Sequence, residues 1–268
     1  MLLSNTLLQS VLTIAEQAGQ YLCHFYNTTL SIHNKEDNTP VTNADLFVSQ
    51  FLIEKLSSLS PHLPVLSEES CNIPLATRET WSSYWLVDPL DGTRQFINKT
   101  GQFSVLISLV HNNIPVLGVI YSPILGRTFY AMKGFGAFKK VKNQITQLAA
   151  TPLDLRQPIK ITIGSLDIKE QLMQRLNPQL QYDFSICGSS GVKSTLVAEN
   201  SADCYIRIGK TGEWDTAVAD ILLAEIGGTV LDFHSNPLTY NKRESLINPN
   251  FIMVSNKNAP WDKIFNFQ

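Results

Sequence analysis

An apolar strand that runs into two acidic residues is the feature that most constrains the fold of this chain. The segment from Tyr84 to Phe96 reads YWLVDPLDGTRQF. Its short buried-strand pattern ends at Asp88, and a second aspartate, Asp91, follows three residues later. Pro89 has a fixed φ angle and favours an extended conformation for Asp88. We therefore expect the chain to turn sharply here and to bring Asp91 round toward Asp88, at the edge of a cleft.

The same turn offers ligands for a hard divalent cation. Two carboxylates and the backbone carbonyl of Leu90, which lies between them, are oxygen donors of the kind that Mg²⁺ prefers. Gly92 and Thr93 follow at once, and a helix that begins there would present free N–H groups and a positive dipole end to a phosphate. The segment thus predicts metal ligands beside an anion seat.

Acidic residues elsewhere can complete such a site. VLSEES places Glu68 and Glu69 at the end of another short strand, and GEWDTAVAD places Asp215 at the N-terminus of a predicted helix. If Glu68 and Asp215 meet the two aspartates of the turn, the four carboxylates can hold two metal ions roughly 3.5 to 4 Å apart. Taken singly, each motif also fits a turn, a helix cap or a solvated loop.

The order of predicted elements indicates a mixed α/β chain with two lobes. Helical patterns cover residues 4–27 and 43–60, and short β-branched and aromatic runs between residues 63 and 141 predict a largely antiparallel sheet. The polar, proline-containing segment 149–158 marks a boundary between lobes 1–148 and 149–268 within one compact unit. The second lobe alternates strands with helices near 167–176, from about 190, and over 215–227, which is typical of an α/β lobe.

Composition and charge exclude several classes of protein. Of the 268 residues, 44% are hydrophobic, and a formal net charge of −2 provides no field for a nucleic acid polymer. The four cysteines form no C-x-x-C pair, so a zinc site is not expected. No basic residue precedes Lys35, and no apolar run is long enough for a membrane span. We expect a cytoplasmic protein, with peripheral attachment to the inner membrane face and a monomeric or homodimeric state left open.

Three of the motifs together carry a resemblance to a known family. VLSEES, WLVDPLDGT and GEWDTA occur in the order and rough spacing typical of the inositol monophosphatase superfamily, and the resemblance runs from TPVTNAD to INPNF. It implies an α/β layered fold, the αβαβα sandwich of the sugar phosphatases. It also implies hydrolysis of a phosphate monoester with two or three Mg²⁺ ions, and inhibition by Li⁺.

The resemblance also implies roles for individual residues. The first metal would be bound by Glu68, Asp88 and the Leu90 carbonyl, and the second by Asp88, Asp91 and Asp215. The substrate would contact Glu68, Leu90, Asp91, Gly92, Thr93, Ser189, Lys193 and Asp215.

The implied reaction uses a water on the first metal whose pKa is lowered. Glu68 and the Thr93 hydroxyl would orient this water for in-line attack on phosphorus, and Asp45 would supply the base through Thr93. For both Thr93 and Asp45, a plain helix cap is the structural alternative.

Within the superfamily, KEDNTPVTNAD, PVLSEES, YWLVDPLDGTRQFI and RESLINPNF are similar to the bisphosphate nucleotidase branch. That branch removes the 3′-phosphate from adenosine 3′,5′-bisphosphate, a by-product of sulfate assimilation, so a nucleoside bisphosphate is the implied partner. Two alternatives remain: an inositol or sugar monophosphatase, and a non-catalytic regulator that binds metal or nucleotide.

A bisphosphate needs a second anion site away from the metals. CGSSGVKSTLVAE offers a flexible turn that leads into a helix, with Lys193 in its first turn, and Arg207 is a second candidate. Both also fit solvated surface charges. DTAVAD departs from the small-residue run usual in the family, so Val218 and Asp220 put the packing of the neighbouring helix in question.

Overall fold

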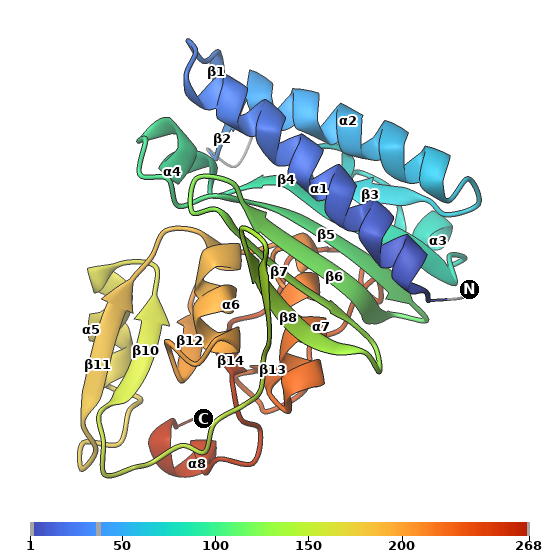
Figure 1. Ribbon diagram of the computed structural model, residues 1–268. Helices are drawn as coiled ribbons and strands as arrows, with labels where there is room; N and C mark the ends of the chain where they lie inside the picture. The colour runs from blue at the N-terminus through green and yellow to red at the C-terminus, as the bar shows by residue number, and fades with distance from the viewer. Residues whose placement is uncertain (1–2, 36–38, 267–268) are drawn as a thin grey trace.

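The computed structural model describes residues 3–35 and 39–266, and it shows five layers (Figure 1). Two long helices cover one face of a seven-stranded sheet, two shorter helices lie between this sheet and a five-stranded one, and two more pack on the far face of the second sheet. In that order the helices are α1 (Asn5–Tyr26), α2 (Asn43–Leu59), α6 (Ser190–Ala198), α7 (Ala217–Ile226), α5 (Leu166–Met173) and α8 (Trp261–Ile264). The predicted αβαβα sandwich is confirmed.

The large sheet is antiparallel except at one edge, where β3 runs parallel to β4. Its strands follow the chain order β3 (Val65–Ser67), β4 (Ser83–Asp91), β5 (Ser104–His111), β6 (Ile114–Ser122), β7 (Arg127–Met132), β8 (Gly136–Val141) and β9 (Gln144–Gln147). Because successive strands are neighbours, short turns suffice to connect β5 through β9, as the turn residues in the sequence predicted, whereas α4 (Thr93–Ile97) lies between β4 and β5.

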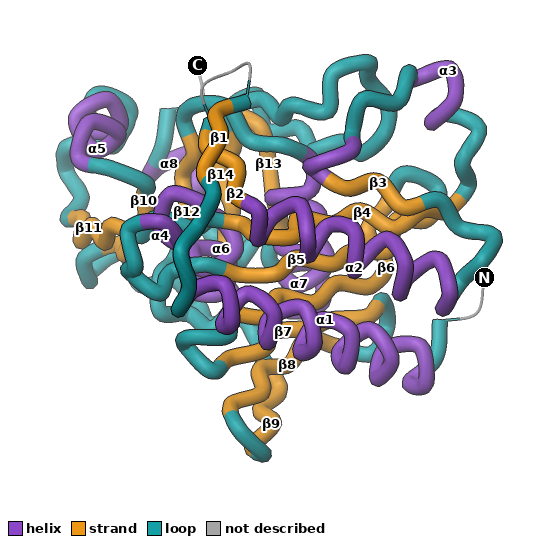
Figure 2. The backbone as a smooth tube through the Cα atoms, turned by 90° about the horizontal axis from the view of Figure 1, so that it is seen from above, coloured by secondary structure: helices purple, strands orange, loops and turns teal. Residues whose placement is uncertain are grey.

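Both faces of strands β4 to β7 are buried, which explains why these strands are largely apolar. Alternate side chains point to opposite faces: Trp85 and Val87 pack with α1 and α2, whereas Tyr84 and Leu86 pack in the core that contains α7. Figure 2 shows α1 and α2 lying side by side across the strands. Ser4 is the N-cap of α1, and its hydroxyl accepts a hydrogen bond from the Leu7 amide.

The second sheet is mixed and has the order β11-β10-β12-β14-β13. Its strands are β10 (Ile159–Ile163), β11 (Tyr182–Ile186), β12 (Cys204–Arg207), β13 (Thr229–Asp232) and β14 (Phe251–Val254). The irregular segment 148–158 separates the two sheets along the chain. Helix α5 ends at Met173, three residues before the end predicted for it from the sequence.

A hairpin of β1 (Ile32–Asn34) and β2 (Pro40–Thr42) leads into α2. Glu36, Asp37 and Asn38, which belong to the KEDNTPVTNAD motif, lie outside the described residues. Within the described ranges, every helix is too short or too polar to cross a lipid bilayer.

Candidate active site

The two aspartates of the opening motif lie on one continuous strand. Contrary to the sharp turn expected at Pro89, β4 runs through to Asp91, and the turn follows at Gly92. Residues three apart on a regular strand would face opposite sides. Here Asp88 pairs with Leu106 and Asp91 with Ser104, so three residues of β4 advance against two of β5. This bulge puts Leu90 in the α1/α2 core and brings Asp91 to the side that Asp88 faces.

Gly92 makes the turn after β4 and opens the short helix α4 (Thr93–Ile97). Its φ angle is +93°, and a Cβ atom at this position would lie 2.9 Å from the Gln102 carbonyl oxygen, so only glycine fits. The predicted helical turn at Thr93 is therefore present.

Thr93 and Asp45 are joined directly. The Thr93 hydroxyl lies 3.0 Å from Asp45 Oδ1, to which it can donate, and 3.3 Å from the Leu90 carbonyl oxygen. The other oxygen of Asp45 accepts from the Thr42 amide and hydroxyl in a capping box at the start of α2. Asp45 is thus a helix cap and a partner of Thr93 at once. Burial raises its pKa, against these hydrogen bonds.

Glu68 follows β3 in the 3₁₀ turn η1 (Glu68–Ser70). Because Ser67 pairs with Val87, the Glu68 carboxyl comes to lie next to that of Asp88. Its charge is shared with Lys35, whose Nζ lies 2.8 Å from both Glu68 Oε1 and Glu69 Oε1. Lys35 was missed from the sequence, although it is the first basic residue of the chain and stands in the motif before Asp45.

Asp215 comes from the other end of the chain. It ends the 3₁₀ turn η2 (Glu213–Asp215), just before α7, rather than lying in the predicted helix. One oxygen each from Asp88, Asp91 and Asp215 lie within 4.8 Å of one another. Three of the four predicted carboxylates therefore meet, and Glu68 adjoins them through Asp88.

The cluster is costly without a cation. Burial, then repulsion from Glu68, Asp91 and Asp215, raises the pKa of Asp88 well above its usual value. Burial, followed by repulsion from Asp91 and Glu68, raises the pKa of Asp215 to about 8. None of the three clustered aspartates forms an ion pair with another described residue. A divalent ion would supply the missing countercharge, and an all-oxygen donor set fits Mg²⁺.

The Asp91 carboxylate also joins the first sheet to α6. It accepts the Ser189 hydroxyl, the Ser190 amide at 3.1 Å and the Gly191 amide at 2.7 Å. An anion at a helix N-terminus satisfies free N–H groups and interacts favourably with the dipole. The glycine–serine turn of the sequence therefore contacts a predicted metal ligand.

Lys193 is buried rather than solvated. Its Nζ donates to the carbonyl oxygens of Cys187 at 2.9 Å and Ser189 at 2.8 Å, and lies 4.9 Å from the centre of the Tyr205 ring. Burial lowers its pKa to about 8. Arg207 Nη2 donates to the Lys210 carbonyl oxygen at 2.8 Å. The surface-charge alternative is therefore wrong for Lys193, and its role in anion binding stays a prediction.

The small-residue run usual in the family is replaced here by DTAVAD, and its bulkier Val218 packs against Gly118 of the large sheet. A Cβ atom on Gly118 of β6 would lie 2.8 Å from Val218 Cγ1 and 3.1 Å from Val218 Cα. It would also lie 2.8 Å from Ile221 Cγ2, so the glycine makes room for both Val218 and Ile221 of α7. Asp220 is partly buried against Tyr240, and burial raises its pKa to about 6.

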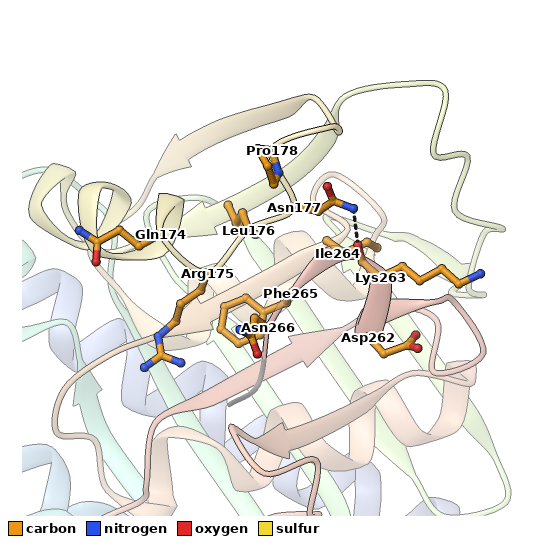
Figure 3. Close-up of a pocket in the computed structure, with 10 residues that line it drawn as sticks. All are labelled: Gln174, Arg175, Leu176, Asn177, Pro178, Asp262, Lys263, Ile264, Phe265 and Asn266. Carbon is orange, nitrogen blue, oxygen red and sulfur yellow. Dashed lines mark hydrogen bonds between the residues drawn. The ribbon is translucent and has the colours of Figure 1, made fainter.

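A separate cavity of about 480 Å³ lies between the segment after α5 and helix α8 (Figure 3). It contains none of the predicted site residues; it is lined by Gln174, Arg175, Leu176, Asn177, Pro178, Asp262, Lys263, Ile264, Phe265 and Asn266. The chemistry points to the carboxylate cluster instead.

Comparisons with known proteins find relatives along nearly the whole chain. The chain is 58% identical over 265 residues to the 3′(2′),5′-bisphosphate nucleotidase CysQ of Aggregatibacter actinomycetemcomitans, covering 99% of this chain and 98% of the relative. The CysQ of Haemophilus influenzae is 52% identical, with the same coverage.

The crystal structure of CysQ from Bacteroides thetaiotaomicron matches 93% of this chain and 97% of its own, with a TM-score of 0.78 and 31% identity. The model of the inositol monophosphatase family matches residues 4–260. With its full length covered by such matches and its acidic motifs gathered in one place, the chain belongs to the inositol monophosphatase family.

Proposed function

We propose that the chain is a Mg²⁺-dependent 3′(2′),5′-bisphosphate nucleotidase that hydrolyses adenosine 3′,5′-bisphosphate to AMP and phosphate. The convergence of Asp88, Asp91 and Asp215, beside Thr93 and Asp45, supports the chemistry. The substrate class rests on the two nucleotidases named above, which are more than half identical to this chain.

For the metal ligands we propose the residues that the sequence predicted. Glu68, Asp88 and the Leu90 carbonyl would hold one Mg²⁺, and Asp91 and Asp215 would share a second with Asp88; a third ion has no assigned ligands. When bound, Mg²⁺ supplies charge that stabilises the phosphoryl oxygens and lowers the pKa of the attacking water.

The protein's own residues position that water. Because the Thr93 hydroxyl donates to Asp45, its lone pairs are free to accept a hydrogen bond from the water. Asp45, held on its other oxygen by Thr42, fixes the hydroxyl in this orientation and would take up the proton through it. Glu68 would accept the water's second hydrogen bond, once the Lys35 ammonium no longer donates to the Glu68 carboxylate.

Substrate contacts are also proposed. Backbone N–H groups of Gly92 and Thr93 would bind the scissile phosphate, and Ser189 and Lys193 would face the second phosphate. To reach it, the Lys193 ammonium would have to give up a hydrogen bond to the Cys187 or Ser189 carbonyl oxygen and donate to a phosphate oxygen instead. We further propose that residues 1–148 and 149–268 act as two lobes of one unit, in a cytoplasmic protein.

A substrate panel tests this proposal. With Mg²⁺, phosphate release from adenosine 3′,5′-bisphosphate should exceed release from inositol 1-phosphate, and Li⁺ should inhibit it. Preference for the inositol ester would make the chain an inositol phosphatase. Binding of the nucleotide without turnover would make it a regulator.

A further inference from the structure

A fully buried arginine lies behind the site, on the short helix α3 (Leu75–Arg78). Arg78 donates from Nε to the Ile73 carbonyl oxygen at 2.7 Å and from Nη1 to Asn241 Oδ1 at 2.6 Å. Its Nη2 donates to the carbonyl oxygens of Arg243 at 3.1 Å and Glu244 at 2.8 Å. All four acceptors are uncharged. A buried charge is retained only where such bonds offset its desolvation, so this is a built polar network.

Asn241 connects Arg78 to the buried carboxyl group of Glu213. Its Nδ2 returns a hydrogen bond to the Arg78 carbonyl oxygen at 2.7 Å, and its backbone N–H donates to Glu213 Oε2 at 2.7 Å. Asn241 has a φ angle of +55°, in the left-handed region that Asn and Gly adopt most readily. Arg243 reaches the other oxygen of Glu213 at 3.4 Å.

Glu213 begins the turn that Asp215 ends. The segment that follows Asn241 holds this turn from outside: the Leu246 carbonyl oxygen accepts the Glu213 amide at 2.9 Å, and Asn248 Nδ2 donates to the Gly212 carbonyl oxygen at 2.7 Å. The Asp215 carboxylate in turn accepts the Gly212 amide at 2.6 Å. The place of Asp215 is therefore set by contacts that lead back to Arg78.

We propose that Arg78, Asn241 and Glu213 are positioning residues, which hold the Asp215 turn so that its carboxylate reaches Asp88 and Asp91. The inference rests on the proposed function, because it concerns the second metal. Loosening the network moves Asp215 relative to the other two carboxylates and leaves those two, on β4, in place. Metal binding that uses Asp215 weakens, whereas binding near Glu68 and Asp88 is retained.

Asn241→Gly in the full chain is the sharpest test. Glycine accepts the positive φ angle and keeps the backbone donor to Glu213, but loses both side-chain bonds to Arg78. The matched control is Leu172→Ala. This substitution is also destabilising, because it leaves a cavity in the core between α5 and the second sheet. Mg²⁺ alone is titrated by calorimetry well below each melting temperature, and turnover is followed against Mg²⁺ concentration.

The expected result is about a tenfold loss of affinity in one Mg²⁺ binding event of Asn241→Gly, with the other unchanged and turnover restored at high Mg²⁺. Leu172→Ala should bind Mg²⁺ as the wild type does. Wild-type Mg²⁺ affinity in folded Asn241→Gly, or an equal loss in Leu172→Ala, overturns the inference. If Asn241→Gly does not fold, Asn113→Gly takes its place as a milder test. It removes the hydrogen bond from Asn113 Nδ2 to the carbonyl oxygen of Tyr240, the residue before Asn241. A wild type that neither binds Mg²⁺ nor releases phosphate overturns the proposed function as well.

Discussion

Asp88 and Asp91 stand on a strand of a large sheet, whereas Asp215 stands on a turn before a helix. The strand is paired with β3 as far as Val87 and with β5 as far as Asp91, and it is buried on both faces, so its two carboxylates are placed largely by the sheet and its core. The turn is placed by side-chain and backbone contacts from residues 241–248 and, behind them, Arg78. One half of the site is thus built by regular structure and the other by a specific polar network.

Asp88→Asn should have the largest effect, because it removes a charge that both proposed metals share. We expect turnover to fall by about 10²–10³-fold or more. The amide oxygen can still accept the Leu90 N–H, so the fold should persist. Without metal at pH 8 the variant should melt at a higher temperature than the wild type, since a buried repelling carboxylate is gone. Turnover within a few-fold of wild type would show that the half of the site carried by β4 is dispensable for catalysis.

Thr93→Ala should come next, with turnover reduced by about 10²-fold. It removes the hydroxyl that joins Asp45 to the proposed water, while Mg²⁺ affinity measured by calorimetry should change little. Thr93→Ser keeps the hydroxyl and serves as the control. If both variants lose the same activity, the threonine acts by packing and the water-orienting role is wrong.

The stability of the metal-free protein should fall as pH rises. Burial and mutual repulsion raise the pKa values of Asp88 and Asp215 in the folded chain above the unfolded value near 3.9. The folded state then binds more protons than the unfolded state up to about pH 8, so the free energy of unfolding decreases across this range.

Thermal melts in EDTA should therefore give a lower melting temperature at pH 8.5 than at pH 5.5, and added Mg²⁺ should stabilise most at pH 8.5. The Asp88→Asn variant should show a weaker dependence on pH. A melting temperature in EDTA that rises from pH 5.5 to pH 8.5 would contradict the raised pKa values of Asp88 and Asp215.

The smallest effect concerns the packing of α7, which follows the Asp215 turn. Gly118→Ala should cost about 1–3 kcal/mol of unfolding free energy, because its methyl group meets Val218. Adding Val218→Ala should recover part of this loss. Urea unfolding of both single variants and the double variant measures the coupling. Strict additivity would show that the glycine does not accommodate the valine.

The acidic residues of the site could be nominated from the sequence because each lies in a local motif. Strand and turn patterns predicted Glu68 after a strand, Asp88 at the end of an apolar run and a helical turn at Thr93, and the structure has these features, except that β4 continues to Asp91 instead of turning at Pro89. Asp215 was nominated in the same way from the start of a predicted helix, and the resemblance to a family added Asp45, whose local pattern alone fits a cap equally well.

The sequence by itself determined the apolar strands and the long helices, because periodicity and turn residues act over short distances; the order of the layers was implied by the resemblance to the family. Only the tertiary structure decided that a bulge, not a sharp turn, aligns Asp91 with Asp88, and that Lys193 is buried. It also decided that Lys35 faces Glu68 and that Arg78 reaches the Asp215 turn through Asn241. These contacts join residues far apart in the chain, and their energies depend on burial and on partners that no local pattern specifies.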